Sequence, residues 1–157
     1  MEKLPITKEG YSKLEEEYKV LKFTERPAII EEIADAREHG DLKENAEYHA
    51  ARDKQSFIEG RLKDLEDKIA RAEVIDVSQL KGNTVKFGAR VDLIDCDNEK
   101  ELSYQIVGEY EADMDIGKIS IKAPISKVLI GKEEGDEVEV NSPGGKKTYE
   151  VLSVNYS

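Results

Sequence analysis

Two acidic residues, Asp41 and Glu44, stand three positions apart in a short stretch that is dense in carboxylates. Carboxylate oxygens are ligands that Mg²⁺ prefers, but the ion takes about six oxygen ligands and gives up its waters reluctantly. Two carboxylates are therefore too few to hold Mg²⁺ alone, although they could complete the shell of an ion already partly bound by another protein. The pair is compatible with a chain that has no metal site or cofactor of its own and lends ligands to an ion held by another protein.

A simpler interpretation of the same pair is helix capping. Asp41 is a good N-cap residue, and Glu44 three positions later would complete a capping box. Acidic side chains in the first turn also interact favourably with the helix dipole. On spacing alone the capping interpretation is preferable, and both interpretations can hold together.

The first 73 residues are rich in helix-forming residues and predict two long helices, over about 8–39 and 42–72. Pro27 interrupts the first helix, where we expect a kink or a short break. The second helix carries a coiled-coil seam with alternating spacings of three and four: Tyr48, Ala51, Gln55, Ile58, Leu62, Leu65, Ile69 and Ala72. A short connection at Gly40 makes the helices antiparallel. Extending the seam backwards reaches Glu44 and Asp41, so both should project from the end of this hairpin.

The remainder of the chain predicts strands, because Val, Ile, Thr and Tyr alternate with charged residues and glycines recur at short intervals. The candidate strands are 84–87, 90–95, 101–107, 119–122, 136–140 and 148–156, with one short helix over 124–130. We expect an α+β fold with an antiparallel coiled-coil arm at 1–75 and a small antiparallel α+β domain at 76–157.

The composition excludes several classes of protein. The net charge of −11 disfavours strong autonomous binding to DNA or RNA, so the expected partner is a protein. The single cysteine, Cys96, excludes an internal disulfide and fits a reducing compartment. We find neither a signal-peptide pattern nor an apolar run of membrane-spanning length, and expect a cytoplasmic protein with no membrane partner.

The run from Ala36 to Arg52, AREHGDLKENAEYHAAR, closely resembles the arm tip of the Gre family of bacterial transcription elongation factors. The resemblance spans the chain and includes Phe87-Gly88-Ala89, Leu129-Ile130-Gly131-Lys132 and Pro143-Gly144-Gly145. Within the family, the stretch Glu47–Arg52 resembles the GreA branch more than the GreB branch.

The resemblance implies an FKBP-like second domain that docks on RNA polymerase at the rim of its secondary channel, while the arm reaches inward. Such a factor is not an enzyme itself. It stimulates the endonucleolytic activity of the polymerase in trans when the enzyme has backtracked and the RNA 3′ end is extruded. Carried over by position, Asp41 and Glu44 are ligands of the Mg²⁺ that is shared with the polymerase active site.

The resemblance also places Ser120 and Pro124 in the surface that docks on the polymerase. In this sequence Ala123 stands where the family commonly has Ser, and Val128 where a small residue is usual, so the carry-over is weaker here than at the tip.

Arg37 and Arg52 are candidate contacts to extruded RNA, although pairing with nearby acidic residues on the helix surface is an equal alternative. His39 and His49 have no cysteine or third histidine with which to form a zinc site, and a structural role is the simpler interpretation.

Three other functions remain open from the sequence. The first is a channel-binding polymerase regulator that does not promote cleavage, against which the intact acidic pair argues. The second is a prolyl isomerase, reached through the FKBP-like domain, but that domain offers few aromatic residues and no tryptophan. The third is a coiled-coil chaperone, whose activity would not depend on Asp41.

Overall fold

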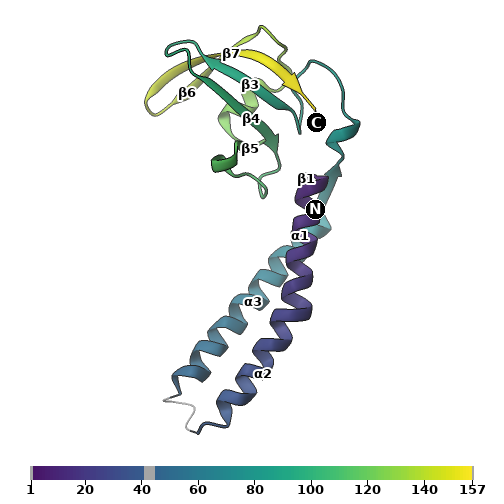
Figure 1. Cartoon of the computed structure of the whole chain (residues 1–157), viewed down its shortest axis with the longest axis vertical. Coiled ribbons are helices and arrows are strands. Elements are labelled where there is room, and N and C mark those ends of the chain that lie inside the picture. Colours follow the sequence, from purple (N-terminus) through teal and green to yellow (C-terminus); the bar gives the residue numbers. More distant parts are fainter. Residues whose placement is uncertain (1, 41–44, 157) are drawn as a thin grey trace. The chain divides into compact units, whose positions relative to one another are not determined.

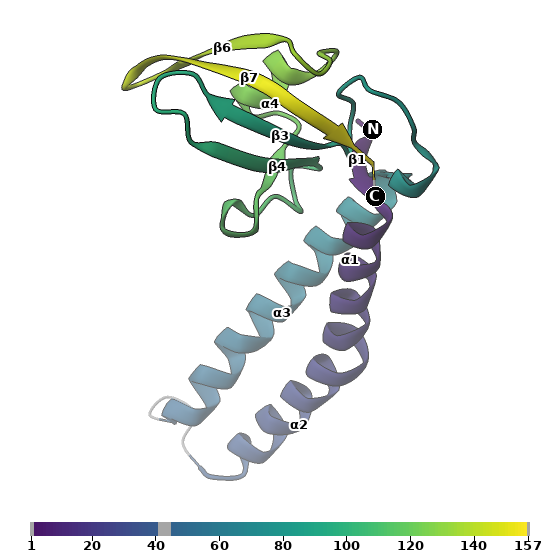
Figure 2. The ribbon, with the colours of Figure 1, turned by 45° about the horizontal axis from the view of Figure 1, so that its top comes forward.

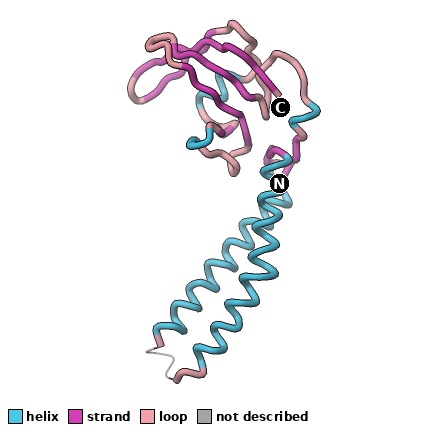
Figure 3. Tube along the Cα trace, in the orientation of Figure 1, coloured by secondary structure: helices cyan, strands magenta, loops and turns pink. Residues whose placement is uncertain are grey.

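The computed structural model describes residues 2–40 and 45–156 and separates into two compact units (Figure 1). One unit, Tyr11–Ala72, is called the arm here. The other combines Glu2–Gly10 with Glu73–Ser157 and is called the sheet unit. Helix dominates the first and strand the second (Figure 3). The α+β class is confirmed. Residues Glu2–Gly10 group with the sheet unit by their contacts, whereas the arm predicted from the sequence, 1–75, includes them.

The helices that form the arm run antiparallel (Figures 1 and 2). The first stretch comprises α1 (Lys8–Val20), a π-helical segment η1 (Leu21–Glu25) and α2 (Arg26–Arg37). The returning helix, α3, spans 26 residues, Ala46–Arg71, and is therefore about 39 Å long at 1.5 Å per residue.

Apolar side chains fill the interface between these helices, as the seam predicts. Ile58, Leu62 and Leu65 of α3 are no more than 2% exposed. They belong to the same side of the helix as the smaller Ala51. The first stretch contributes the buried residues Ile29, Ile33 and Ala36.

The π-helical segment replaces the break expected near Pro27. Proline has no N–H and cannot donate the helical hydrogen bond of its position, so the regular pattern is already interrupted there. Leu21, Ile29 and Ile33 are separated by multiples of four residues, a spacing that drifts around a regular α-helix by about 40° per step. A π turn accommodates an additional residue. The segment therefore brings Ile29 and Ile33 back to the interface, where both are buried.

Two bidentate ion pairs connect the antiparallel helices. Arg26 contacts Glu59 with N–O distances of 2.7 and 2.8 Å, and Arg61 contacts Glu17 at 2.5 and 2.8 Å. The hydrogen bonds from Arg61 lower the pKa of the Glu17 carboxyl, and those from Arg26 lower that of Glu59. Paired carboxylates and guanidinium groups of this geometry fix the register of the helices as well as adding modest stability.

The sheet unit contains a five-stranded sheet in the order β5-β4-β3-β7-β6. Its strands are β3 (Arg90–Asp95), β4 (Glu101–Val107), β5 (Lys118–Ser120), β6 (Glu137–Ser142) and β7 (Gly145–Asn155). Short 3-10 helices lie at η2 (Val77–Gln79) and η3 (Met114–Ile116). A second sheet pairs β1 (Leu4–Thr7) with β2 (Ala72–Ile75).

Most of the expected strands are present, with two differences. All pairs in the large sheet are antiparallel except β4–β5, which is parallel, so the sheet is mixed rather than purely antiparallel. Residues 84–87 form only an isolated bridge from Thr84 to Glu133 in place of the expected strand.

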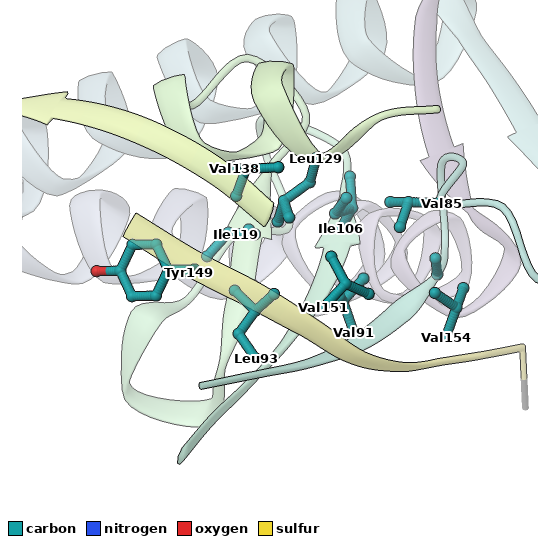
Figure 4. Close-up of a cluster of buried hydrophobic side chains, with 11 residues drawn as sticks. Val85, Val91, Leu93, Ile106, Ile119, Leu129, Val138, Tyr149, Val151 and Val154 are labelled. Atoms are coloured by element: carbon teal, nitrogen blue, oxygen red, sulfur yellow. The ribbon is translucent and has the colours of Figure 1, made fainter. Parts of the chain in front are cut away.

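The helix α4 (Pro124–Leu129) covers one face of the large sheet, as Figure 2 shows. Leu129 from this helix packs into a core of alternating strand residues (Figure 4). The fully buried members include Val91, Leu93 and Ile106, and Tyr149 lies at the margin of the same cluster.

A carboxylate holds the start of α1 within the sheet unit. Glu111 accepts hydrogen bonds from the Thr7 amide at 2.8 Å, from the Thr7 hydroxyl, and from the Gly108 amide at 2.9 Å. The Thr7 hydroxyl in turn accepts the Gly10 amide at 3.1 Å and caps the helix. A side chain at Gly108 would collide with the carbonyl oxygen of Pro5. These contacts explain why residues 2–10 group with the sheet unit.

Within the described ranges no helix has the length and apolar character needed to span a membrane.

Candidate functional site: the end of the arm

The two acids that the sequence singles out, Asp41 and Glu44, lie outside the described residues. Their assignment as Mg²⁺ ligands stays a prediction. The structure does describe both helices that lead to them: α2 ends at Arg37, with Glu38 as its C-cap, and α3 begins at Ala46. The connection between the two antiparallel helices thus includes the acidic pair.

Asn45, whose role was not predicted from the sequence, makes two hydrogen bonds at this end of the arm. Its side-chain oxygen accepts the backbone N–H of Tyr48 at 3.0 Å, which makes it the N-cap of α3. Its side-chain nitrogen donates to the carbonyl oxygen of Ala36 on α2 at 2.6 Å. The assignment of Asp41 as N-cap is therefore wrong for this helix. Asparagine is among the most favoured N-cap residues, so its position before Ala46 was the available signal.

Two arginines from different helices gather around the ring of Tyr48. The guanidinium carbon of Arg37 lies 5.8 Å from the ring centroid and that of Arg52 lies 5.9 Å from it. Arg52 also donates to the Tyr48 hydroxyl at 3.0 Å. Hydrogen bonding by Arg37, and then by Arg52, lowers the pKa of the Tyr48 phenol. The aromatic face and the phenol oxygen thus hold two like charges side by side on the half-buried Tyr48.

This cluster places Arg37 and Arg52 together, as their roles as candidate RNA contacts would require. The sequence predicts either contacts to RNA or pairing with nearby acidic residues. In the structure both arginines also contact the aromatic ring of Tyr48, so neither prediction describes the cluster fully. Tyr48 is both a seam residue and the centre of the cluster. Two guanidinium groups therefore lie beside one another in an otherwise acidic stretch, and guanidinium groups are donors that suit phosphate oxygens.

A shallow hollow of about 440 Å³ lies between α2 and α3 next to this cluster. Its polar lining is mainly acidic, with His39 and Lys54 among the carboxylates Glu32, Asp35 and Glu47. Across residues 2–40 and 45–156, no group of three or more His, Cys, Asp or Glu side chains is arranged to hold a metal ion. The ring of His49 packs edge-on against Tyr48, with centroids 5.6 Å apart, which supports a structural role.

The two residues expected to dock on the polymerase lie close together in the sheet unit. Ser120 is the last residue of β5, and Pro124 is the exposed first residue of α4. The Ser120 carbonyl oxygen accepts the hydroxyl of the buried Ser126 at 2.6 Å and the amide of Ala123 at 2.9 Å. The turn between them is therefore fixed by hydrogen bonds, and it presents Pro124 at the surface. Their role in docking stays a prediction.

The aromatic residues of the sheet unit are used for packing. Tyr149 belongs to the core, Tyr104 packs against it, and burial raises the pKa of both phenols. Tyr156 donates its hydroxyl to the carbonyl oxygen of Thr84 at 2.5 Å. These three tyrosines therefore pack in the core or at its edge and do not line an open aromatic pocket.

Comparison with known proteins gives matches along almost the whole chain. Residues 4–74 match the family model described as transcription elongation factor, N-terminal, and residues 80–156 match the model for the GreA/GreB C-terminal part. The chain is 60% identical to the transcription elongation factor GreA of Phenylobacterium zucineum over 156 residues, covering 99% of both proteins. It is also 60% identical to that of Ruegeria pomeroyi over 157 residues, covering 100% of both.

Solved structures of similar proteins were also found. Gfh1 of Thermus aquaticus has 27% sequence identity and a TM-score of 0.45, covering 99% of both chains. The GreA/GreB factor of Nitrosomonas europaea has 25% identity and a TM-score of 0.44, covering 99% of this chain and 100% of the other. The relationship rests on the sequences, because these superpositions are weak.

Proposed function

The chain belongs to the GreA/GreB family of transcription elongation factors, and we propose that it stimulates RNA polymerase to cleave its own backtracked transcript. The observation that carries this proposal is the arm: α2 and α3 are antiparallel, and the connection between them contains Asp41 and Glu44. The factor would supply side chains in trans, and the polymerase would perform the hydrolysis. The proposed setting is the bacterial cytoplasm, where the transcript is made.

The proposed route to the polymerase active site is its secondary channel. A pair of helices about 10–12 Å wide each can enter a channel that a globular domain cannot. The bidentate pairs Arg26–Glu59 and Arg61–Glu17 support the register of such a probe along its length. The sheet unit would dock at the rim of the channel through the turn between Ser120 and Pro124.

The Mg²⁺ in this proposal belongs to the polymerase, with Asp41 and Glu44 completing its coordination. The chemistry of the donor set fits this division, since two carboxylates satisfy only part of the coordination that the ion requires. When bound, Mg²⁺ supplies charge stabilisation for phosphodiester hydrolysis and lowers the pKa of a bound water. The acidic side chains Glu32, Asp35 and Glu47 nearby favour a cation at this end of the arm.

Arg37 and Arg52 are proposed to contact the extruded RNA 3′ end. Their shared contact with Tyr48 supports the proposal, because it keeps two phosphate-binding groups together in a chain of net charge −11. In this arrangement the arginines hold the transcript while the acids act on the metal. No strong binding to free DNA or RNA is expected.

The test uses stalled elongation complexes with end-labelled RNA, Mg²⁺ and either the wild-type or a variant protein. The double variant D41N/E44Q should abolish stimulated cleavage while its binding to polymerase persists. A matched control, E38Q/E47Q, removes the same number of negative charges from the same end of the arm and should retain most of the activity. Cleavage by D41N/E44Q at the wild-type rate would refute the mechanism.

The same complexes separate the alternative functions. A regulator that only occupies the channel would bind and alter elongation with no cleavage by the wild-type protein. A prolyl isomerase would act on a tetrapeptide substrate without polymerase, and the committed tyrosines of the sheet unit argue against such a pocket. A coiled-coil chaperone would protect an unfolded client equally well with and without Asp41.

A further inference from the structure

The side-chain amide of Asn45 joins the end of α2 to the start of α3 by two hydrogen bonds. Its two contacts use different atoms. The oxygen accepts the Tyr48 amide at 3.0 Å, and the nitrogen donates to the Ala36 carbonyl at 2.6 Å. Donor and acceptor are nine residues apart in the sequence, so the second bond closes the connection between the helices.

Each contact satisfies a backbone group that a helix end leaves without a helical partner. The Ala36 carbonyl belongs to the last turn of α2, and the Tyr48 amide belongs to the first turn of α3. Capping α3 alone requires only an acceptor, which Asp or Ser also provides. The contact with Ala36 also needs a donor, which an ionised carboxylate lacks. Asparagine at this position therefore does more than start a helix.

The bridge lies next to two buried alanines. Ala36 and Ala51, at 5% and 6% exposure, both line the hollow between α2 and α3. His39 donates its amide to the same Ala36 carbonyl at 3.1 Å, so the first residues after α2 are also fixed there. The contacts made by Arg37 and Arg52 with Tyr48 lie on the next turn of α3.

We propose that Asn45 is a positioning residue for cleavage: by bonding to Ala36 and Tyr48 together, it fixes the two ends of the connection that carries Asp41 and Glu44. The inference rests on the proposed function, which assigns the acids their role. Asn45 itself touches neither the transcript nor the metal in this scheme. Loss of its bond to Ala36 should therefore lower the rate of stimulated cleavage without changing the affinity for the polymerase.

The test separates the bridge from the cap. N45D retains an acceptor for the Tyr48 amide but opposes a carboxylate to the Ala36 carbonyl. N45S retains a capping hydroxyl without adding a charge and is too short to reproduce both contacts. N45A removes both contacts and reports the cost of losing the cap.

The expected result is that N45D and N45S keep the wild-type helical content, melting temperature to within a few degrees, and affinity for polymerase. Their cleavage rate should nevertheless drop at least about tenfold, since misplacement by about 1 Å can cost roughly a hundredfold. The Mg²⁺ concentration for half-maximal cleavage should rise, which a general loss of arm stability would not produce. In the wild-type protein, NMR should show slow exchange of the Asn45 side-chain amide protons.

Several results would overturn the inference. Wild-type cleavage and Mg²⁺ dependence in N45D and N45S would show that the bridge does not matter. If cleavage by N45D and N45S decreased only in proportion to their helix content or their affinity for polymerase, Asn45 would act only as the N-cap of α3. If the wild-type protein stimulates no cleavage, the proposed function and the inference both fail, whereas active wild-type protein with active N45D refutes the inference alone.

Discussion

Adjacent residues on α3, Phe57 and Ile58, provide a sharp test of how the arm is held together. Phe57 is 71% exposed, whereas Ile58 is 2% exposed and packs in the cluster that contains Ile29 and Leu62. Judged by size and hydrophobicity alone, truncation of Phe57 should be the more damaging change. The seam predicts the opposite order.

The magnitude follows from burial. Replacing a buried Ile by Ala usually costs about 2–5 kcal/mol, because the removed atoms lose their apolar surroundings and a cavity remains. A cost of about 3 kcal/mol in a unit the size of Tyr11–Ala72 corresponds to a decrease in Tm of roughly 12–24 °C. Removal of an exposed side chain stays within about 0.5 kcal/mol, or a few degrees.

The assay is thermal unfolding followed by circular dichroism at 222 nm. Helix in the sheet unit is short, so this signal reports mainly the arm. Hydrogen exchange measured by mass spectrometry then shows whether peptides from the large sheet keep their protection in I58A. Equal destabilisation by F57A and I58A, or a larger effect of F57A, would refute the assignment of the seam.

Three further predictions concern one ion pair and two glycines. Hydrogen bonds from Arg61 lower the pKa of Glu17 in the folded arm, so the stabilisation from this pair is present above the unfolded pKa of about 4.3 and is lost as the pH falls through the lower folded value. E17Q should therefore lower the Tm of the arm at pH 7, by the equivalent of no more than about 1 kcal/mol for a partly exposed pair. This difference should shrink as the pH falls below the unfolded pKa and should vanish once the carboxyl of the folded arm is protonated; a difference that grows on acidification would contradict the sign. G108A should destabilise the sheet unit by about 1–3 kcal/mol in denaturant unfolding, because the new methyl group meets Pro5. In contrast, G60A on α3, where a methyl group meets no atom within 4 Å, should stabilise the arm by about 0.5–1 kcal/mol, and a loss of stability in G60A would contradict the helix assignment.

The sequence predicted the arm best where one periodic signal extends over many residues. The spacing of Ile58, Leu62 and Leu65 identified the buried face of α3, and the structure confirms it. Likewise β3 and β4 occupy the expected residues, because apolar and polar side chains alternate along both. Long, regular elements are set mainly by local pattern.

Features that depend on contacts between distant residues were missed. Strand β1 pairs with β2, although the helices of the arm lie between them in the sequence. Residues 4–7 are also too few to show a recognisable strand pattern. The parallel pairing of β4 with β5 depends on the intervening turn through η3, where Gly117 adopts a positive φ of 73°. Glu111 likewise has no local signal for its role at the start of α1, 104 residues away from its partner Thr7.

The end of the arm lies between these cases. The importance of the acidic stretch was evident from its composition, but the cap was assigned to an acid, although Asn45 makes it. The clustering of Arg37 with Arg52 follows once the helices are antiparallel, since Tyr48 faces both. The second hydrogen bond of Asn45 depends on where the end of α2 lies relative to the start of α3, which spacing alone does not specify.

The π-helical segment Leu21–Glu25 lies in the first helical stretch of the arm, where the number of residues determines the direction in which the later side chains point. Deleting one residue there would permit an uninterrupted α-helix and would shorten the separation of Leu21 from Ile29 from eight residues to seven, which is about 20° short of two full turns. Ile29 and Ile33 would therefore keep facing Leu62. Deleting two residues would turn the part beyond them by about a further 100° and take both side chains away from Leu62. A one-residue deletion near Phe23 should therefore leave the arm folded with more regular backbone hydrogen bonding, whereas a two-residue deletion should misdirect its distal end.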